Sequence, residues 1–125
     1  MSYKSKKLRN SARLAPCLLR SPDCNCNIET TVLCHDNSIS SGKGMGVKAH
    51  DYFAFLGCYG CHTNESKYKE LIPFAIKDTW LYWLRRGYLK VTDKAAFDEV
   101  ITEVDWLECK RKFQKLWDEG VIYEP

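Results

Sequence analysis

Cysteine and histidine residues are the part of this sequence best suited to chemistry. Cys58 and Cys61 form a C-x-x-C pair, and a looser C-x6-C pair lies upstream at Cys17 and Cys24. Two intervening residues let both thiolates reach one metal ion, and a second pair can complete a closed tetrahedral zinc site. The spacing therefore predicts a structural Zn²⁺ held by four sulfur ligands.

Other residues compete for this zinc site. Cys26 forms a C-x-C pair with Cys24, Cys34 lies further along, and His62, directly after Cys61, would complete a site of three cysteines and one histidine. A redox C-x-x-C and buried free thiols are further interpretations, but the sequence lacks the thioredoxin-like βαβ alternation that accompanies a redox motif. The pattern favours zinc and leaves the choice between Cys24 and Cys26 open.

Two histidines remain for other work if the zinc takes only sulfur ligands. His35 ends an apolar, β-branched run, and His62 stands at the start of a helical segment. A histidine can take a proton from water near neutral pH, and Mg²⁺ or Mn²⁺ can offset charge on a phosphate. Each histidine alone would be an ordinary polar residue. Together with the zinc pattern they indicate hydrolysis of a phosphate ester.

The first twenty residues are strongly basic and contain no acid, although the net charge of the whole chain is only +3. Such a segment either binds phosphates with salt-sensitive affinity or serves as a solubilising arm. We expect DNA as the partner. The candidate phosphate-binding residues are Lys6, Lys7, Arg9, Arg13 and Arg20, with Lys43 and Lys48 in the loop that follows the first strand.

Length and cysteine count limit the class of protein. A chain of 125 residues has the size of one domain with a helical tail. Seven cysteines, an odd number, argue against a fully paired disulfide framework, and the polar, basic start lacks the apolar core of a secretory signal. We expect a cytoplasmic protein that does not enter the membrane.

Apolar runs predict the elements that must position these residues. The expected elements are strands at 30–35 and 51–57, and helices at 62–67, 76–88 and 94–119, the last as one helix or two. An aromatic stripe on the last segment, formed by Trp106, Phe113 and Trp117, is expected to pack in a core or against a second copy of the chain in a homodimer.

Paired strands, a loop and a helix opening on C-x-x-C form the layout of a treble-clef zinc fold. Over residues 13–91 the chain resembles the YbcO-like family of small prophage proteins classed as nucleases, within the HNH-like, ββα-metal endonucleases. The resemblance rests on Cys17-Leu-Leu-Arg-Ser-Pro-Asp-Cys24, Glu29-Thr-Thr-Val-Leu33 before His35, Gly44-x-Gly46-x-Lys48 with Asp51, Cys58-x-x-Cys61-His62, and Trp83-Leu84 before a glycine.

The resemblance implies an α+β fold: a small zinc-stabilised treble-clef, ββα-metal (HNH-like) core followed by C-terminal helices. Residues 1–13 would be a basic arm, 14–91 the zinc-binding domain and 92–125 a helical extension. The family places the zinc on the four cysteines of the two pairs, the general base at His35, the middle residue of the motif at Asp51 and a divalent-cation ligand at His62. The activity implied is endonucleolytic hydrolysis of DNA.

One departure from the HNH pattern bears on activity. The residue before the base is usually a metal-binding His, Asp or Glu, whereas this chain has Cys34, so Asp36 or Glu65 would have to supply the ligand. The alternative functions are a non-catalytic zinc-knuckle DNA-binding protein of phage recombination or replication, and a zinc-stabilised protein-interaction module.

Overall fold

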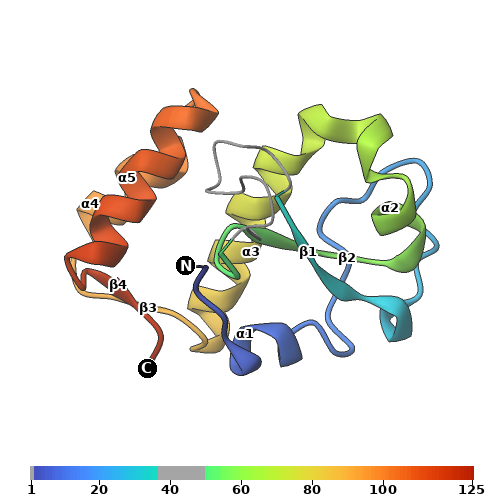
Figure 1. Cartoon of the computed structure of the whole chain (residues 1–125), viewed down its shortest axis with the longest axis horizontal. Coiled ribbons are helices and arrows are strands. Elements are labelled where there is room, and N and C mark those ends of the chain that lie inside the picture. Colours follow the sequence, from blue (N-terminus) through green and yellow to red (C-terminus); the bar gives the residue numbers. More distant parts are fainter. Residues whose placement is uncertain (1, 37–49) are drawn as a thin grey trace. The chain divides into compact units, whose positions relative to one another are not determined.

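The computed structural model describes residues 2–36 and 50–125. They fall into two compact units, residues 1–80 and 81–125, which divide inside one helix. This division follows compactness alone. The predicted domain limits, 14–91 and 92–125, describe instead which residues form the zinc-binding fold, and they stay a prediction. The first unit contains α1 (Lys6–Asn10), the 3-10 helix η1 (Ile28–Thr30), β1 (Val32–His35), β2 (Ala54–Gly57), α2 (Tyr59–Thr63), the 3-10 helix η3 (Glu65–Leu71) and the first part of α3 (Ile72–Arg86) (Figure 1).

The two predicted strands form an antiparallel pair. Val32 of β1 faces Gly57 of β2, and His35 faces Ala54 at the other end of the pair. Beyond the strands, the Asp36 amide donates to the Phe53 carbonyl at 2.9 Å, which continues the ladder by one residue. Both strands are shorter than their apolar runs. Ile28–Thr30 instead forms a 3-10 turn, capped by the side chain of Asn27.

The core of the first unit lies between β2 and α3. All four residues of β2 are buried, and Trp80 of α3 is fully buried. The Trp80 indole donates to the Tyr52 carbonyl at 2.6 Å, and the Thr79 hydroxyl accepts from the Leu56 amide at 3.1 Å. These bonds satisfy polar groups inside an apolar core, where an unpaired group would cost about 1–3 kcal/mol.

The basic N-terminal segment folds against this core. α1 begins at Lys6 because the Ser5 side chain accepts from the Leu8 amide at 3.0 Å, an N-cap bond. Leu8 is fully buried, and it anchors the helix through the apolar side chain between its basic residues.

The helix at the cysteine knuckle begins earlier than the sequence predicts. We expected it from residue 62, but α2 starts at Tyr59 because Cys58 is its N-cap, with Sγ accepting from the Cys61 amide at 3.5 Å. His62 therefore lies within α2. α3 begins at Ile72, with Pro73 in its first turn, where the missing N–H has no helical partner to lose.

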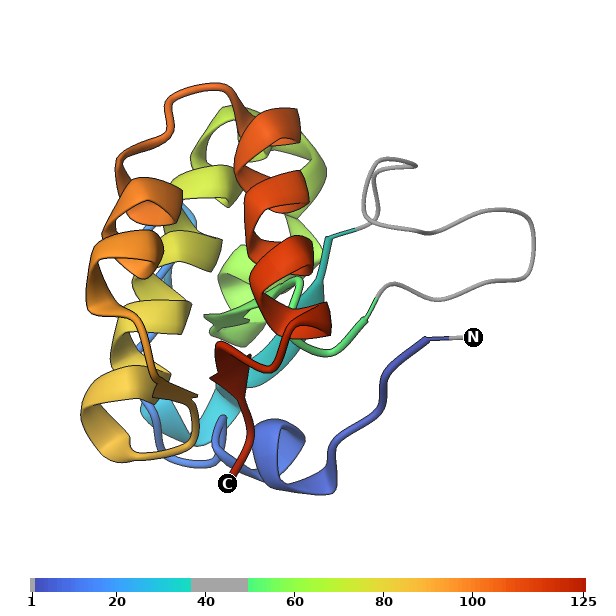
Figure 2. The same cartoon turned by 90° about the vertical axis from the view of Figure 1, so that its left-hand side faces the viewer.

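The second unit contains the end of α3 and a helical hairpin closed by two short strands (Figure 2). Its elements are β3 (Lys90–Val91), α4 (Lys94–Thr102), α5 (Trp106–Asp118) and β4 (Ile122–Tyr123), with β3 and β4 antiparallel. Of the two alternatives for 94–119, two helices is the confirmed one. The predicted aromatic stripe contributes Phe113 to the core of this unit, where Phe97, Val100, Cys109 and Ile122 are also buried.

The mixed α and β composition with small sheets confirms the α+β prediction at that level. In the part of the chain that the structure describes, no helix is long and apolar enough to cross a bilayer.

Candidate active site and metal centre

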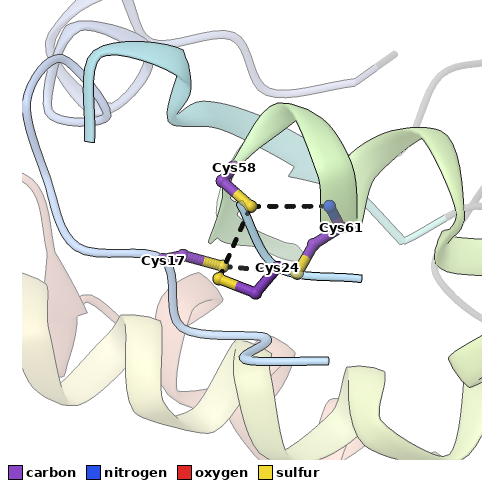
Figure 3. Close-up of side chains that lie close together, drawn as sticks. All are labelled: Cys17, Cys24, Cys58 and Cys61. Atoms are coloured by element: carbon purple, nitrogen blue, oxygen red, sulfur yellow. Dashed lines mark hydrogen bonds between the residues drawn. The ribbon is translucent and has the colours of Figure 1, made fainter. Parts of the chain in front are cut away.

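Four cysteine side chains converge in the first unit (Figure 3). Cys17 and Cys24 come from the segment between α1 and η1, whereas Cys58 and Cys61 come from the N-cap and first turns of α2. The Sγ atoms of Cys17 and Cys61 lie 3.5 Å apart, those of Cys24 and Cys58 lie 3.7 Å apart, and all four lie within 4.8 Å of one another.

The segment that carries Cys17 and Cys24 is held close to α2 by backbone contacts. The Leu18 amide donates to the Leu56 carbonyl of β2 at 2.7 Å, which places Cys17 beside the end of the hairpin. Gly60 lies between the two cysteines of α2, and a Cβ atom there would collide with the Asp23 carbonyl oxygen. Of the two residues between Cys58 and Cys61, the second is thus a glycine because the segment that carries Cys24 passes close over it.

The cluster has the dimensions of a four-sulfur zinc site. Four thiolates about 2.3 Å from a tetrahedral ion lie about 3.8 Å from one another, close to the two shortest sulfur separations in the cluster. The Asn25 amide points at Cys58 Sγ at 3.4 Å, and the Ser21 hydroxyl lies 3.1 Å from Cys61 Sγ. Such donors favour a charged sulfur. These four residues could hold a structural metal such as zinc.

The thiols of the cluster titrate differently from one another. Burial alone would raise the pKa of Cys58, but hydrogen bonds from the Cys61 and Asn25 amides outweigh it and lower this pKa to about 6. Burial raises the pKa of Cys24 to about 12, with the neighbouring sulfurs of Cys58 and Cys17 adding to the shift. Of Cys24 and Cys58, Cys58 is therefore the one that favours the thiolate form, which accepts hydrogen bonds from its neighbours.

The rival cysteines lie outside this cluster. Cys26, two residues after Cys24, is exposed and has a left-handed backbone conformation with φ of 56°, and Cys34 is buried in β1. The structure therefore brings Cys24 and not Cys26 to the other three sulfurs.

His35, at the end of β1, lies against a buried carboxylate. Its Nε2 is 2.7 Å from Asp51 Oδ1. Asp51 also accepts from the Ser5 amide at 2.7 Å and from the Arg9 guanidinium, with Nε at 2.9 Å from Oδ2 and Nη2 at 3.3 Å from Oδ1. The Asp51 side chain is only 1% exposed, whereas that of His35 is 25% exposed. One buried carboxylate thus joins α1 to a histidine that solvent can reach.

Asp51 is held in its ionised form. Burial alone would raise its pKa, but hydrogen bonds from Arg9, His35 and the Ser5 amide outweigh burial, and the pKa of Asp51 is lowered. An ionised carboxylate only accepts hydrogen bonds, so the Nε2 of His35 must be the donor in their contact.

His62 belongs to a second group of side chains. Ligand atoms of Cys34 (β1), His62 (α2) and Glu65 (η3) all lie within 4.8 Å of one another, and His62 Nδ1 is 3.1 Å from Glu65 Oε2. Burial, with the negative charge of Glu65 adding to it, raises the pKa of the Cys34 thiol well above its usual range. The two predicted catalytic histidines therefore fall in separate clusters, although Cys34 and His35 are consecutive residues of β1.

The predicted phosphate-binding residues divide into two kinds. Lys6, Lys7 and Arg13 are exposed on or just after α1. Arg9 instead binds Asp51, and Arg20 lies 3.8 Å from Asp78 of α3. Lys43 and Lys48 lie outside the described residues, as do Gly44 and Gly46.

Sequence reasoning missed the partners of Asp51. Ser5 and Arg9 are 46 and 42 residues away from it, and no local pattern links them. Glu65 was detectable, because it follows His62 by three residues and such positions share one face of a helical segment.

The chain is similar to proteins of one known family. The family model described as "Putative nuclease YbcO" matches residues 6–94. A solved structure described as that of "a putative bacteriophage protein" from Escherichia coli str. K-12 substr. MG1655 is 28% identical, covers 63% of this chain and 98% of its own, and has a TM-score of 0.49. No curated protein matches the chain.

Proposed function

The chain belongs to the YbcO family, and from that premise we propose that it is a metal-dependent DNA endonuclease of the HNH type, with His35 as general base. The observation that carries the proposal is the contact of 2.7 Å between His35 and the buried carboxylate of Asp51. A carboxylate in this position fixes the orientation of an imidazole and selects the form of it that can act as a base.

The contact with Asp51 sets the tautomer of His35. Since Nε2 donates to the ionised carboxylate, a neutral His35 carries its proton on Nε2 and has its lone pair on Nδ1. That nitrogen can take a proton from a water molecule that attacks a phosphodiester. The imidazolium formed in this step is stabilised by Asp51, which Arg9 and the Ser5 amide hold in place.

The cysteine cluster would have a structural role and take no part in the reaction. Zn²⁺ bound by Cys17, Cys24, Cys58 and Cys61 has no open coordination position, so its role is to fix α2 against the β1–β2 pair. A divalent cation held near His62 would offset the negative charge that builds on the phosphate. In this proposal His35 and the cation at His62 act on the same phosphate.

Exposed cations on α1 and just after it would hold the DNA backbone. Lys6, Lys7 and Arg13 are close in sequence to Arg9, whose guanidinium reaches the carboxylate beside the proposed base. Phosphates bound by these side chains would therefore lie near His35, and the affinity would depend steeply on salt.

The test compares cleavage of linear, single-stranded and branched DNA by wild type and His35→Ala over a series of divalent cations. We expect cation-dependent cleavage by the wild type and none by His35→Ala, with the same zinc content and the same circular-dichroism spectrum in the two proteins. Cleavage that survives His35→Ala contradicts the assignment of the base.

A second outcome would identify a different class of protein. Cys34, which stands where HNH proteins place a metal-binding His, Asp or Glu, favours a non-catalytic zinc-knuckle DNA-binding protein as the alternative. Salt-dependent binding to DNA, with no cleavage of any substrate by the wild type, would support that alternative.

A further inference from the structure

Three side chains outside the cysteine cluster form a second group with the composition of a metal site. Cys34, His62 and Glu65 come from β1, α2 and η3, and each contributes one ligand atom within 4.8 Å of the other two. Tetrahedral ligand atoms around a small divalent ion lie about 3–4 Å apart, so modest side-chain rotation would close this group on an ion.

The surrounding fold leaves room for the sulfur of Cys34. Cys34 is fully buried and faces Phe55 in the strand register. Gly57, the last residue of β2, lies beside the sulfur of Cys34. A Cβ on Gly57 would be 3.1 Å from Cys34 Sγ and 2.9 Å from the Phe55 ring. The absence of a side chain at Gly57 thus leaves space for Cys34 Sγ.

The other two side chains open the group to solvent. His62 and Glu65 are three residues apart, and their side chains are 47% and 17% exposed. One buried and two accessible ligands form a site that a small molecule can approach from one side. Three protein ligands with an open position are typical of a catalytic metal site and not of a structural one.

We propose that Cys34, His62 and Glu65 form a second metal site that selects a thiophilic divalent transition ion, such as Zn²⁺, over Mg²⁺. Thiolate and imidazole ligands suit zinc and cobalt, whereas Mg²⁺ requires oxygen ligands in near-octahedral geometry and gains nothing from a thiolate. The sequence had predicted Mg²⁺ or Mn²⁺ at His62. The thiol within the same group changes the expected ion.

The role of this ion in cleavage rests on the proposed function, whereas its binding does not. Cys34 replaces an oxygen or nitrogen ligand by a soft one, so a nuclease built on this site would be supported by Zn²⁺ or Co²⁺ and not by Mg²⁺ alone. Glu65 supplies the one hard ligand of the group.

The experiment measures metal bound per chain after equilibrium dialysis of the reduced, full-length protein against Co²⁺, with and without excess Mg²⁺. We expect two cobalt ions in the wild type, both with sulfur-to-cobalt charge-transfer absorption, and no loss of the second ion to Mg²⁺. In Cys34→Ser the ion at the four-sulfur site remains. The second ion binds more weakly by more than about 100-fold, because loss of a ligand costs more than the roughly 10- to 100-fold that loss of a group hydrogen-bonded to a ligand costs.

Two further variants guard against misfolding of Cys34→Ser. Glu65→Gln and His62→Gln change partly exposed side chains, and each is expected to weaken only the second cobalt ion. Cys26→Ser, which removes an exposed thiol outside both groups, is the matched control and is expected to bind two ions.

One bound ion in the wild type, or displacement of the second ion by Mg²⁺, overturns the inference. Two bound cobalt ions without cleavage of any DNA would support the second metal site and contradict the proposed nuclease activity. One ion with Mg²⁺-dependent cleavage that requires His35 would do the reverse, so the two proposals fail separately.

Discussion

At the scale of single residues, Asp51 determines whether His35 can act as a base. Asp51→Asn keeps the shape of the side chain but removes its charge, so His35 loses its anionic acceptor and Arg9 loses its ion pair. We expect a slower single-turnover cleavage rate with unchanged DNA affinity. The free energy of unfolding should fall by about 1.5–3 kcal/mol, since hydrogen bonds to a charged group are lost while Arg9 and His35 can still be hydrated. Urea unfolding measures the second effect, and an unchanged cleavage rate would contradict the first.

The same carboxylate gives a pH dependence of stability. The pKa of Asp51 is lower in the folded chain than its ordinary value of 3.8. Its stabilising contribution is therefore complete above that ordinary value and is lost as the pH falls through the lower folded-state pKa. Urea unfolding of the wild type between about pH 6 and about pH 3 should show a steeper loss of stability than that of Asp51→Asn. Asp98→Asn, which removes the exposed partner of Lys94, is the control and should keep the wild-type slope.

Arg9 and Lys6 are neighbours on α1 for which we expect opposite effects. Arg9 binds the carboxylate beside the proposed base, whereas Lys6 is exposed. Arg9→Ala should reduce the cleavage rate at saturating DNA and leave the salt dependence of binding unchanged. Lys6→Ala should reduce the slope of log affinity against log salt by roughly 0.9 and leave the saturated rate unchanged. Binding titrations over a salt series, with single-turnover rates, separate the two. A lower salt slope in Arg9→Ala would return that residue to its predicted role as a phosphate ligand.

At the scale of elements, the knuckle depends on a close approach at Gly60. A methyl group there would meet the Asp23 carbonyl oxygen, which is backbone and cannot rotate away. Gly60→Ala should therefore separate the Cys17–Cys24 segment from α2 and weaken zinc binding, measured by competition with a chromophoric chelator. Gly87→Ala is the control. Its φ of +81° makes alanine strained, by about 1 kcal/mol, but nothing lies within 4 Å of a Cβ there, and the four clustered cysteines belong to the other unit. Equal zinc affinity in both variants would contradict the role of the close approach.

Elements with a clear apolar pattern could be predicted, whereas their ends could not. The strand pair and α3 follow from β-branched and aromatic spacing, but α2 begins three residues before the expected position because a cysteine side chain caps it. Thiols are not among the usual N-cap residues, so ordinary capping rules give no signal there. The sequence likewise did not decide whether 94–119 forms one helix or two. No proline or glycine marks the break between α4 and α5, and α4 ends before Glu103 while Val104 is 94% exposed.

At the scale of the whole molecule, the candidate site combines short-range motifs with long-range contacts. The C-x-x-C-H segment and the two cysteine pairs could be read from the sequence, because metal ligation restricts residue type and spacing. The bonds from Ser5 and Arg9 to Asp51 could not, because polar contacts between distant segments restrict neither. In the group of Cys34, His62 and Glu65, the spacing of three residues between His62 and Glu65 could be read from the sequence, whereas the approach of Cys34 to them depends on the packing of β1 against α2 and η3.

Removal of the proposed zinc should affect the two units of the chain unequally. All four clustered cysteines lie in the unit of residues 1–80, whereas the unit of residues 81–125 has buried apolar residues of its own. Structural zinc contributes roughly 10–16 kcal/mol in small metal-binding folds, as much as the whole stability of a typical domain. A strong chelator should therefore unfold the first unit and leave the hairpin of α4 and α5 folded.

Hydrogen exchange on the full chain measures this difference amide by amide. In the chelated protein, the Leu18 and Asp36 amides, which bond to β2 and Phe53, should lose protection, while the Thr92 amide, which bonds to Val121, should keep it. Cys24→Ser should reproduce the effect of the chelator because Cys24 lies in the cluster, whereas Cys26→Ser should retain zinc and protection. Equal loss of protection in both units would show that they unfold as one, and no loss in either would show that the four-sulfur site does not hold the fold together.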